Sequence, residues 1–419
     1  MTIAQMVAKL TAGDPPLRFE AYDGSGFGPT NTDITMRLKN ERGLRYLATA
    51  PGDLGMVRAY VSGDLDLDGT HPGDPYDALR LMDRWRFRRP TPAELAVLVR
   101  EMGVRRMVPP EPPRQEALPR WRRVAEGFRH SRQRDAGSIQ RHYDVSNSFY
   151  EKILGPSMAY TCAVFPHAEA SLEEAQHEKF DLVCRKLGLE PGMRLLDVGS
   201  GWGGMVRHAV QHYGVTAVGV TLSAEQAKWG ALAIQREGLS ARAEIILGDY
   251  RDAPGHGYDA VSSIGLLEHV GVANYQAYFS FLRGKLREGG RLLNHCITRP
   301  QNNTRVTTGA FIDRYVFPDG ELTGSGRIIL AAQDAGLEVR HEENLREHYA
   351  LTLERWCDNL VSRWDACVAD VGEVTARVWG LYMAGSRLGF ETNEVQLHQV
   401  LAARVGPDGA SGFPLRASW

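Results

Sequence analysis

The chain has 419 residues, of which 43% are apolar and 24% are charged, a composition typical of a folded protein and not of a disordered or fibrous one. Its length predicts about two or three domains and excludes a single small binding module. The formal net charge of −2 gives no indication of a nucleic-acid partner.

No apolar run reaches the ~18 residues that a membrane-spanning helix needs, and residues 1–16 lack the pattern of a secretory signal. The five cysteines are widely spaced, form no CxxC pair and accompany no histidines at zinc spacing. The sequence therefore predicts a reduced, cytoplasmic protein without a metal site, peripheral to the inner face of the membrane if its substrate is a lipid.

The N-terminal residues predict a small accessory domain, residues 1–107. Apolar residues at positions 3, 6, 7 and 10 predict a short amphipathic helix that ends before Gly13. Short apolar runs separated by Gly- and Asp-rich turns follow to about residue 90 and predict an α+β arrangement. Thr91-Pro92-Ala93-Glu94 has the pattern of a capping box with proline at the first helical position, so a helix is expected from there to about Arg106.

A proline- and arginine-rich segment, residues 108–137, follows this domain. Between Arg105 and Arg134 there are nine arginines and three glutamates, a local net charge of +6. The composition is typical of a solvated linker between domains. It also suits contact with anionic lipid head groups, near which each arginine contributes about 1 kcal/mol.

Residues 138–419 alternate between strand-like and helix-like runs. Strands are predicted at 193–198, 216–222, 243–247, 258–264 and 291–298, with helices at 224–237 and 274–286. This alternation predicts an α/β fold in which a mostly parallel, doubly wound, Rossmann-like sheet is covered on both faces.

The first of these strands runs into a glycine-rich turn, residues 197–204 (DVGSGWGG). A GxGxxG pattern alone is weak evidence, since it also serves dinucleotides. An NAD site needs an acidic residue at the end of the second strand, where this chain has Thr221-Leu222-Ser223, so a dehydrogenase is disfavoured. Asp197 before the first glycine, together with Gly248-Asp249-Tyr250 after the third strand, resembles the S-adenosylmethionine site of class I methyltransferases.

This resemblance implies which residues bind the cofactor. Asp197 and the glycines would lie against the methionine part, Thr221, Leu222 and Gln226 near the ribose, and Asp249 and Tyr250 beside the adenine. The predicted cofactor-binding residues are Tyr160, Thr161, Asp197, Gly199, Gly201, Gly203, Thr221, Leu222, Gln226, Asp249 and Tyr250.

Five further motifs occur in order along the chain: residues 142–150 (HYDVSNSFY), 158–163 (MAYTCA), 267–271 (LEHVG), 293–297 (LNHCI) and 348–353 (HYALTL). They resemble the cyclopropane fatty acid synthase family of S-adenosylmethionine-dependent lipid methyltransferases. The resemblance covers about residue 138 to the C-terminus, and residues 57–66 more weakly resemble the family's N-terminal lipid-associated domain. It implies a methyltransferase domain, residues 138–419, with helices that complete a lipid pocket.

The family's reaction needs a base. A carbon–carbon double bond is a poor nucleophile, so methyl transfer requires aligned partners and exclusion of water, and the resulting cation must lose a proton. In the family a bound bicarbonate is that base, held by residues that match Cys162, Glu268, His295 and Tyr349 here. Each alone would more ordinarily be structural, as a buried cysteine or tyrosine, an exposed glutamate or a core histidine. Their joint order favours the catalytic role.

The resemblance also suggests a product. Asn294 and Cys296 flank His295 where the family more often has an apolar residue and threonine, which puts ring closure in doubt. The Arg-rich segment and residues 364–390 resemble actinobacterial relatives that form 10-methylene-stearoyl chains, precursors of tuberculostearic-type lipids. We therefore expect methyl transfer to an oleoyl phospholipid, with a homodimer and a separate reductase as implied partners. The alternatives are a cyclopropane synthase, a non-catalytic lipid-binding protein, and an N- or O-methyltransferase of a small molecule.

Overall fold

The computed structural model describes residues 1–50, 52–118, 146–302 and 306–419, and its contacts divide the chain into two compact units. Unit 1 comprises Met1–Leu118, Gly309–Pro318 and Trp356–Leu388. Unit 2 comprises the described residues of Pro119–Thr308, Asp319–Arg355 and Gly389–Trp419. This division differs from the predicted boundaries, because two later segments group with the N-terminal residues. Most of the predicted linker and residues 142–145 of the first motif lie outside the described residues.

Unit 1 contains a four-stranded sheet with the strand order β3-β2-β4-β5, in which β2 and β4 are parallel and the other neighbours are antiparallel. Phe19 of β2 and Met36 of β4 are buried in one core with Leu44 and Val57 from the helices, so one face of the sheet is covered. The predicted N-terminal helix is confirmed, whereas the helix that begins after Thr91 ends four residues earlier than predicted. The elements are α1 (Ile3–Leu10), β1 (Thr11–Ala12), β2 (Arg18–Ala21), β3 (Gly26–Phe27), β4 (Thr35–Leu38), α2 (Glu41–Thr49), α3 (Asp53–Val61), β5 (Leu65–Asp68), α4 (Tyr76–Met82), β6 (Arg86–Phe87), α5 (Pro92–Met102), η1 (Val104–Met107), η5 (Ile312–Val316) and α16 (Trp364–Val371), with parts of α15 (Arg346–Ser362) and α17 (Glu373–Glu391).

The described part of the predicted linker is held to unit 1 by a buried carboxylate, that of Glu116. Two guanidinium nitrogens of Arg58 donate to it at 2.6 and 2.7 Å, Arg314 donates to it as well, and the Tyr315 hydroxyl donates at 2.9 Å. A buried charge persists only where opposite charges and hydrogen bonds compensate for its lost hydration. Glu116 therefore anchors residues 108–118 to the rest of unit 1, although most side chains of this segment are exposed.

Unit 2 is built around a seven-stranded sheet with the order β12-β13-β11-β10-β7-β8-β9. β13 runs antiparallel to both of its neighbours, and the strands from β11 to β9 are parallel to one another. The strands are β7 (Arg194–Val198), β8 (Thr216–Thr221), β9 (Ala243–Leu247), β10 (Tyr258–Ile264), β11 (Leu286–Thr298), β12 (Glu338–Asn344) and β13 (Gln396–Ala403). The helical elements are α8 (Asn147–Leu154), α9 (Leu172–Leu187), α10 (Gly204–Tyr213), α11 (Ala224–Arg236), η3 (Tyr250–Asp252), α12 (Leu267–Val270), η4 (Val272–Asn274), α13 (Tyr275–Lys285) and α14 (Ser325–Asp334).

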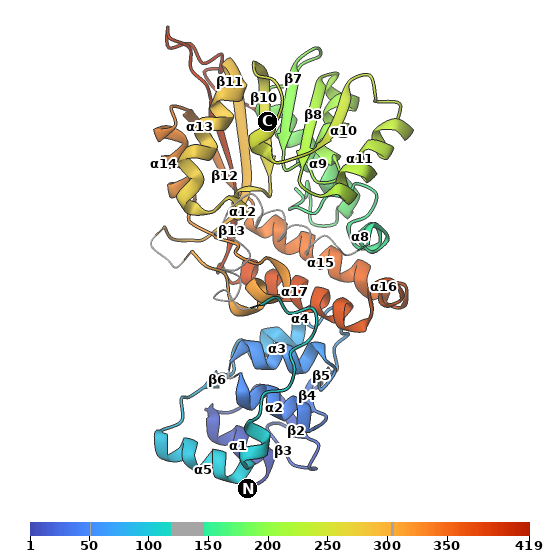
Figure 1. The fold of residues 1–419 in the computed structure, drawn as a ribbon, viewed down its shortest axis with the longest axis vertical. Helices are drawn as coiled ribbons and strands as arrows, with labels where there is room; N and C mark the ends of the chain where they lie inside the picture. The colour runs from blue at the N-terminus through green and yellow to red at the C-terminus, as the bar shows by residue number, and fades with distance from the viewer. Residues whose placement is uncertain (51, 119–145, 303–305) are drawn as a thin grey trace. The chain divides into compact units, whose positions relative to one another are not determined.

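Helices lie on both sides of this sheet, and each side has its own core (Figure 1). In β7, Leu195 packs with residues of α9 and α10, while Leu196 packs with residues of α13 and α14. Successive side chains of a strand point to opposite faces, so a strand buried on both faces is mostly apolar, with polar residues such as Asp197 near its carboxyl end. Burial on both faces of the sheet therefore explains the long apolar runs that predicted these strands.

The fold class predicted from the sequence is confirmed, and the five predicted strands are present. β11 begins five residues earlier than predicted, and β12 and β13 were not predicted. The strand order reverses between β7 and β10, where a doubly wound sheet opens a crevice at the carboxyl ends of its strands. This is where the candidate site lies.

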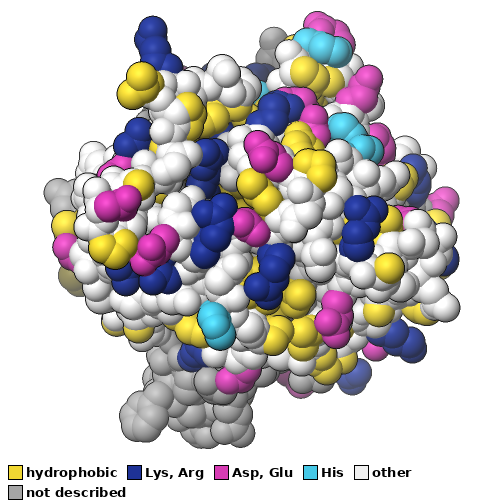
Figure 2. All heavy atoms as spheres, turned by 90° about the horizontal axis from the view of Figure 1, so that it is seen from above, with side chains coloured by type: hydrophobic (Ala, Val, Ile, Leu, Met, Phe, Trp, Pro, Cys, Tyr) yellow, Lys and Arg dark blue, Asp and Glu magenta, His cyan; other side chains and the backbone are white. Residues whose placement is uncertain are grey.

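Two surface properties bear on a lipid substrate. Within the described ranges, no helix is both long and apolar enough to cross a membrane. On the face drawn in Figure 2, Lys and Arg side chains are interspersed with Asp and Glu, and no large area of one charge stands out. That face therefore offers no continuous basic surface to anionic head groups.

Candidate active site

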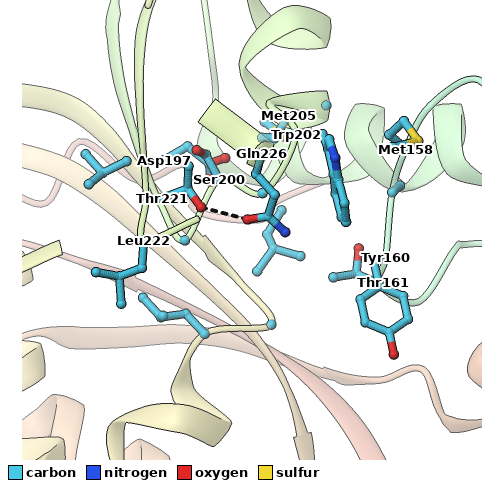
Figure 3. Close-up of a pocket in the computed structure, with 18 of the residues that line it drawn as sticks. Met158, Tyr160, Thr161, Asp197, Ser200, Trp202, Met205, Thr221, Leu222 and Gln226 are labelled. Carbon is cyan, nitrogen blue, oxygen red and sulfur yellow. Dashed lines mark hydrogen bonds between the residues drawn. The ribbon is translucent and has the colours of Figure 1, made fainter. Parts of the chain in front are cut away.

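A pocket opens at the carboxyl ends of β7, β8 and β10 and encloses about 890 Å³, part of it open to solvent. Nine of the predicted cofactor residues line it: Tyr160, Thr161, Asp197, Gly199, Gly201, Thr221, Leu222, Gln226 and Tyr250. Figure 3 shows Met158, Tyr160 and Thr161, from the loop before α9, on the opposite side of the pocket from Thr221 and Gln226.

The glycine turn between β7 and α10 forms one wall. Gly199, Gly201 and Gly203 all have positive φ angles, of 74°, 54° and 79°, which side chains other than glycine rarely adopt. A Cβ on Gly201 would meet nothing within 4 Å, whereas one on Gly203 would lie 2.9 Å from Cδ1 of Ile245. Gly201 therefore keeps the pocket open, and Gly203, which is not among the lining residues, allows α10 to pack closely on β9.

Asp197 and Lys179 place two buried ionisable groups at the pocket. The Asp197 carboxylate accepts a hydrogen bond from Ser262 at 2.6 Å, and burial raises its pKa to about 7. The Lys179 ammonium donates to Thr161 Oγ1 at 2.9 Å, and burial lowers its pKa to about 7. Each group favours the charged form of the other. The pair can therefore bind a ligand that carries both an ammonium and a carboxylate, such as an amino acid.

The opposite part of the pocket is suited to hydroxyl groups and an aromatic ring. Thr221 Oγ1 donates to Gln226 Oε1 at 2.7 Å, and the Ser223 hydroxyl caps α11 by accepting from the Gln226 amide (Figure 3). Tyr250 lines the pocket, but Asp249 does not. The Asp249 carboxylate instead accepts hydrogen bonds from the Arg251 guanidinium at 2.5 and 2.7 Å. The predicted contact of Asp249 with the adenine stays a prediction.

Several pocket residues were missed by sequence reasoning, chiefly Met158, Lys179, Ser200, Trp202 and His269. Trp202 and Ser200 are part of the glycine motif, so they were within reach of the analysis. Met158 has a positive φ of 51°, which is costly for a side chain other than glycine and concentrates at functional sites.

The predicted catalytic residues gather beside the same end of the sheet. Glu268, in α12 after β10, accepts from the Ile297 amide at 2.7 Å, and Ile297 pairs with Leu397. The Leu397 carbonyl accepts from the Leu345 amide, and the Leu345 carbonyl accepts from both the Tyr349 amide at 3.2 Å and the Cys162 thiol at 3.8 Å. Hydrogen bonds on either side of the β11–β13 pairing therefore connect Glu268 with Tyr349 and Cys162, which are far apart in the sequence.

Glu268 and His295 each present an unsatisfied polar atom. Oε2 of Glu268 and Nε2 of His295 are buried, and neither has a hydrogen-bond partner among the described residues. Burial raises the pKa of Glu268 to about 7, and burial beside Lys179 and Lys186 holds the pKa of His295 well below its usual value. Burial also raises the pKa of the Cys162 thiol, so it is not a thiolate nucleophile at neutral pH. A buried polar atom without a partner is costly, so a small polar ligand that met both of these atoms would be stabilised there.

The tautomer of His295 follows from two residues that the sequence did not point to. Lys186 has only donors, so the atom of Gln399 that accepts from it at 2.7 Å is the amide oxygen. The amide nitrogen of Gln399 then donates to His295 Nδ1 at 3.2 Å. A neutral imidazole whose Nδ1 accepts carries its proton on Nε2. His295 therefore offers an N–H donor to whatever occupies the site.

Asn294 and Cys296, the departures from the family pattern, lie on the other face of β11 from His295. Cys296 is part of the core beneath α13, and Asn294 Nδ2 donates to its sulfur at 3.2 Å. They do not contact the His295 ring across the strand, because neighbouring side chains of a strand point to opposite faces. Cys296 is nevertheless close to a predicted catalytic residue, because, besides burial, the charge of Glu268 contributes to the raised pKa of the Cys296 thiol.

Comparison with known proteins adds independent information. A family model described as mycolic acid cyclopropane synthetase matches residues 130–400. A probable fatty acid methyltransferase of Mycobacterium tuberculosis is 59% identical over 421 residues, covering 100% of this chain and 98% of that protein. A tuberculostearic acid methyltransferase of the same organism is 35% identical over 290 residues, which cover 66% of this chain and 67% of that protein. A mycolic acid cyclopropane synthase solved with S-adenosylhomocysteine and CTAB is 31% identical, with a TM-score of 0.60 over 64% of this chain and 97% of that one.

Proposed function

Because the chain belongs to the mycolic acid cyclopropane synthetase family, we propose that it transfers a methyl group from S-adenosylmethionine to the double bond of an oleoyl chain in a phospholipid, giving a 10-methylene-stearoyl chain. The observation that carries the proposal is the pair of unsatisfied buried atoms, Glu268 Oε2 and His295 Nε2, beside the pocket.

The pocket suits S-adenosylmethionine, which supplies an electrophilic methyl group. Asp197 matches the ammonium of its methionine part, and Lys179 matches the carboxylate. Thr221 and Gln226 offer oxygen and nitrogen atoms to the ribose hydroxyls, and Tyr250 offers a ring to the adenine. These contacts fix the cofactor, so that the methyl group meets the substrate in one orientation.

The second site suits bicarbonate, which supplies the base for the proton that leaves the methylated chain. In this proposal Glu268 Oε2 would accept its hydroxyl, and the Nε2–H of His295 would donate to one of its oxygens; both atoms are buried and have no partner among the described residues. Cys162 and Tyr349 complete the proposed set. Burial strengthens these hydrogen bonds, which favours binding of the bicarbonate ion, and it keeps water away from the cation formed on the acyl chain.

Two products share one cation. Methyl transfer to one alkene carbon leaves the positive charge on the other. If a hydride shifts to the charged carbon and the new methyl group then loses a proton, the product is an exocyclic methylene; if the methyl group loses its proton first, a ring closes. The relative named as a tuberculostearic acid methyltransferase supports the methylene. The family's description supports the ring as the alternative.

The remaining expectations belong to this proposal. A methylene product implies a separate reductase that saturates it, because the described residues form one nucleotide-type pocket. A phospholipid substrate implies a location at the inner surface of the membrane, with residues 1–107 as an accessory domain and residues 108–137 near the head groups. A homodimer is the proposed assembly.

The test is to express the chain in a bacterium that lacks its own cyclopropane synthase and is supplied with oleate. Fatty acid methyl esters are separated by chromatography and the branch is located by derivatisation and mass spectrometry. We expect a C19 methylene ester, which should be absent with Glu268→Gln. A cyclopropane ester would keep the reaction class and replace the product. With soluble protein and no C19 ester, methyl transfer to small amines or hydroxyls would support the third alternative, and cofactor binding without turnover would support a lipid-binding protein.

A further inference from the structure

Three histidines form a cluster on helices α9 and α10, and none of them lines the pocket. His208 and His212 are one turn apart on α10, with ring centroids separated by 4.5 Å. His177 of α9 lies 4.7 Å from the first ring and 5.1 Å from the second. One nitrogen from each ring lies within 4.8 Å of the other two. Each of the three imidazoles therefore has a nitrogen close to one small volume.

A carboxylate orients the central ring of this cluster. Asp181 Oδ1 lies 2.9 Å from His208 Nε2, and a carboxylate can only accept, so Nε2 carries the proton and Nδ1 carries the lone pair. Asp181 is itself held by the Tyr213 hydroxyl at 3.2 Å and by Arg185 at 3.1 Å. Metal-binding histidines commonly donate their second ring nitrogen to a carboxylate in this way.

We propose that His177, His208 and His212 bind a divalent transition-metal ion, Zn²⁺ foremost, with Asp181 as a positioning residue. Three neutral imidazoles and one water are a common zinc environment, and imidazole nitrogens favour such borderline cations over Mg²⁺ or Ca²⁺. Two nitrogens, each about 2.1 Å from a tetrahedral zinc ion, are about 3.4 Å apart. His177 and His212 are exposed, so rotation of their side chains can bring the nitrogens to that separation.

The site joins two helices that cover one face of the sheet. Lys179 is on α9, two residues after His177, and α10 begins directly after the glycine turn. A metal ion that binds only the folded protein stabilises it in proportion to the logarithm of its concentration. The proposed metal therefore fixes the packing of α9 against α10 and takes no part in methyl transfer.

The test uses the full chain without a polyhistidine tag. Equilibrium dialysis against Zn²⁺, with the metal measured by mass spectrometry, should give one ion per chain, and Co²⁺ should give the visible absorption of a tetrahedral or five-coordinate nitrogen site. His177→Ala and His212→Gln, both surface changes, should each weaken zinc affinity at least tenfold. Asp181→Asn should weaken it by about 10- to 100-fold. His256→Ala, at an exposed histidine outside the cluster, should leave it unchanged.

Thermal unfolding separates loss of the metal from loss of the fold. Without metal, His212→Gln should melt at the temperature of the parent chain, and zinc should raise the melting temperature of the parent chain but not that of the variant. Failure of the parent chain to retain zinc would overturn the proposal. So would equal zinc binding by the parent chain and by both histidine variants.

Discussion

The tautomer of His295 gives the sharpest prediction, because it is set by one replaceable side chain. In Gln399→Glu the new carboxylate can only accept a hydrogen bond, so it favours the His295 tautomer that carries its proton on Nδ1. In this tautomer Nε2 has no proton and can only accept. The substitution is nearly the same size, and Lys186 remains beside the new carboxylate. The donor that faces the proposed anion is therefore lost without a cavity.

The expected effect follows from the kind of hydrogen bond removed. A bond from Nε2–H to an anion is worth about 1.5–3 kcal/mol, which corresponds to a loss of roughly 10- to 150-fold in kcat. Gln399→Leu is the matched control, because it stops fixing the tautomer without reversing it, and Lys186, which loses an acceptor, keeps its ion pair with Glu343. A lost neutral hydrogen bond of about 1 kcal/mol predicts a loss of about fivefold in kcat.

The assay is transfer of a labelled methyl group from S-adenosylmethionine to oleoyl phospholipid at varied bicarbonate concentration. The Gln399→Glu protein should need more bicarbonate, and ¹⁵N NMR of the His295 ring should show the proton moved from Nε2 to Nδ1. A Gln399→Glu protein that is as active as Gln399→Leu, at the same bicarbonate requirement, would refute the reasoning.

Three further predictions concern stability and cofactor binding. Burial raises the pKa of Glu268 from 4.5 to about 7, so the folded state loses stability as the pH rises through this range. In urea unfolding, Glu268→Gln should therefore be more stable than the parent chain by about 3 kcal/mol at pH 8 and equally stable below about pH 4.5. The same difference at both pH values would contradict this prediction. Gly201→Ala should weaken S-adenosylhomocysteine binding in calorimetry and lower the free energy of unfolding by about 1 kcal/mol. Gly203→Ala, which creates a close contact with β9, should chiefly lower the melting temperature. The reverse pattern would refute the separate roles of the two glycines. Glu116→Gln should destabilise unit 1 by about 3 kcal/mol in urea unfolding, because its two arginine partners stay buried. The control Glu94→Gln, at an exposed ion pair, should change the free energy of unfolding little. Equal effects of the two variants would show that burial does not strengthen the contribution of Glu116.

The sequence predicted those parts of the fold that local patterns encode. The strands β7 to β10 are apolar runs bounded by glycine, because each is covered on both faces. β12 alternates between half-buried and exposed residues, and β13 follows a long helical region, so neither had a neighbour in the sequence to indicate its pairing. β13 pairs with β11, about a hundred residues earlier, and β12 pairs with β13, so the place of both strands depends on contacts between distant parts of the chain.

The residues of the candidate site also differ in whether a local sequence pattern could predict them. Asp197, the glycines and Glu268 lie in short contiguous motifs, so their types and spacing point to the chemistry. Lys179 and Lys186 are on an ordinary amphipathic helix, where lysine is usually solvated, and only the tertiary fold buries them. The histidine cluster was missed for a related reason: His208 and His212 are one helical turn apart, but the third ring comes from another helix.

The position of β13 has a consequence for how the protein is made. Residues 396–403 are synthesised after every other strand, yet they insert between β11 and β12 and bring Gln399 to His295. Until they leave the ribosome, β11 and β12 present open edges that can pair with other chains. The residues that line the pocket all precede β13, whereas the amide that sets the tautomer of His295 belongs to it. A chain that is cut before β13 would therefore keep the pocket residues and lose a part of the proposed bicarbonate site.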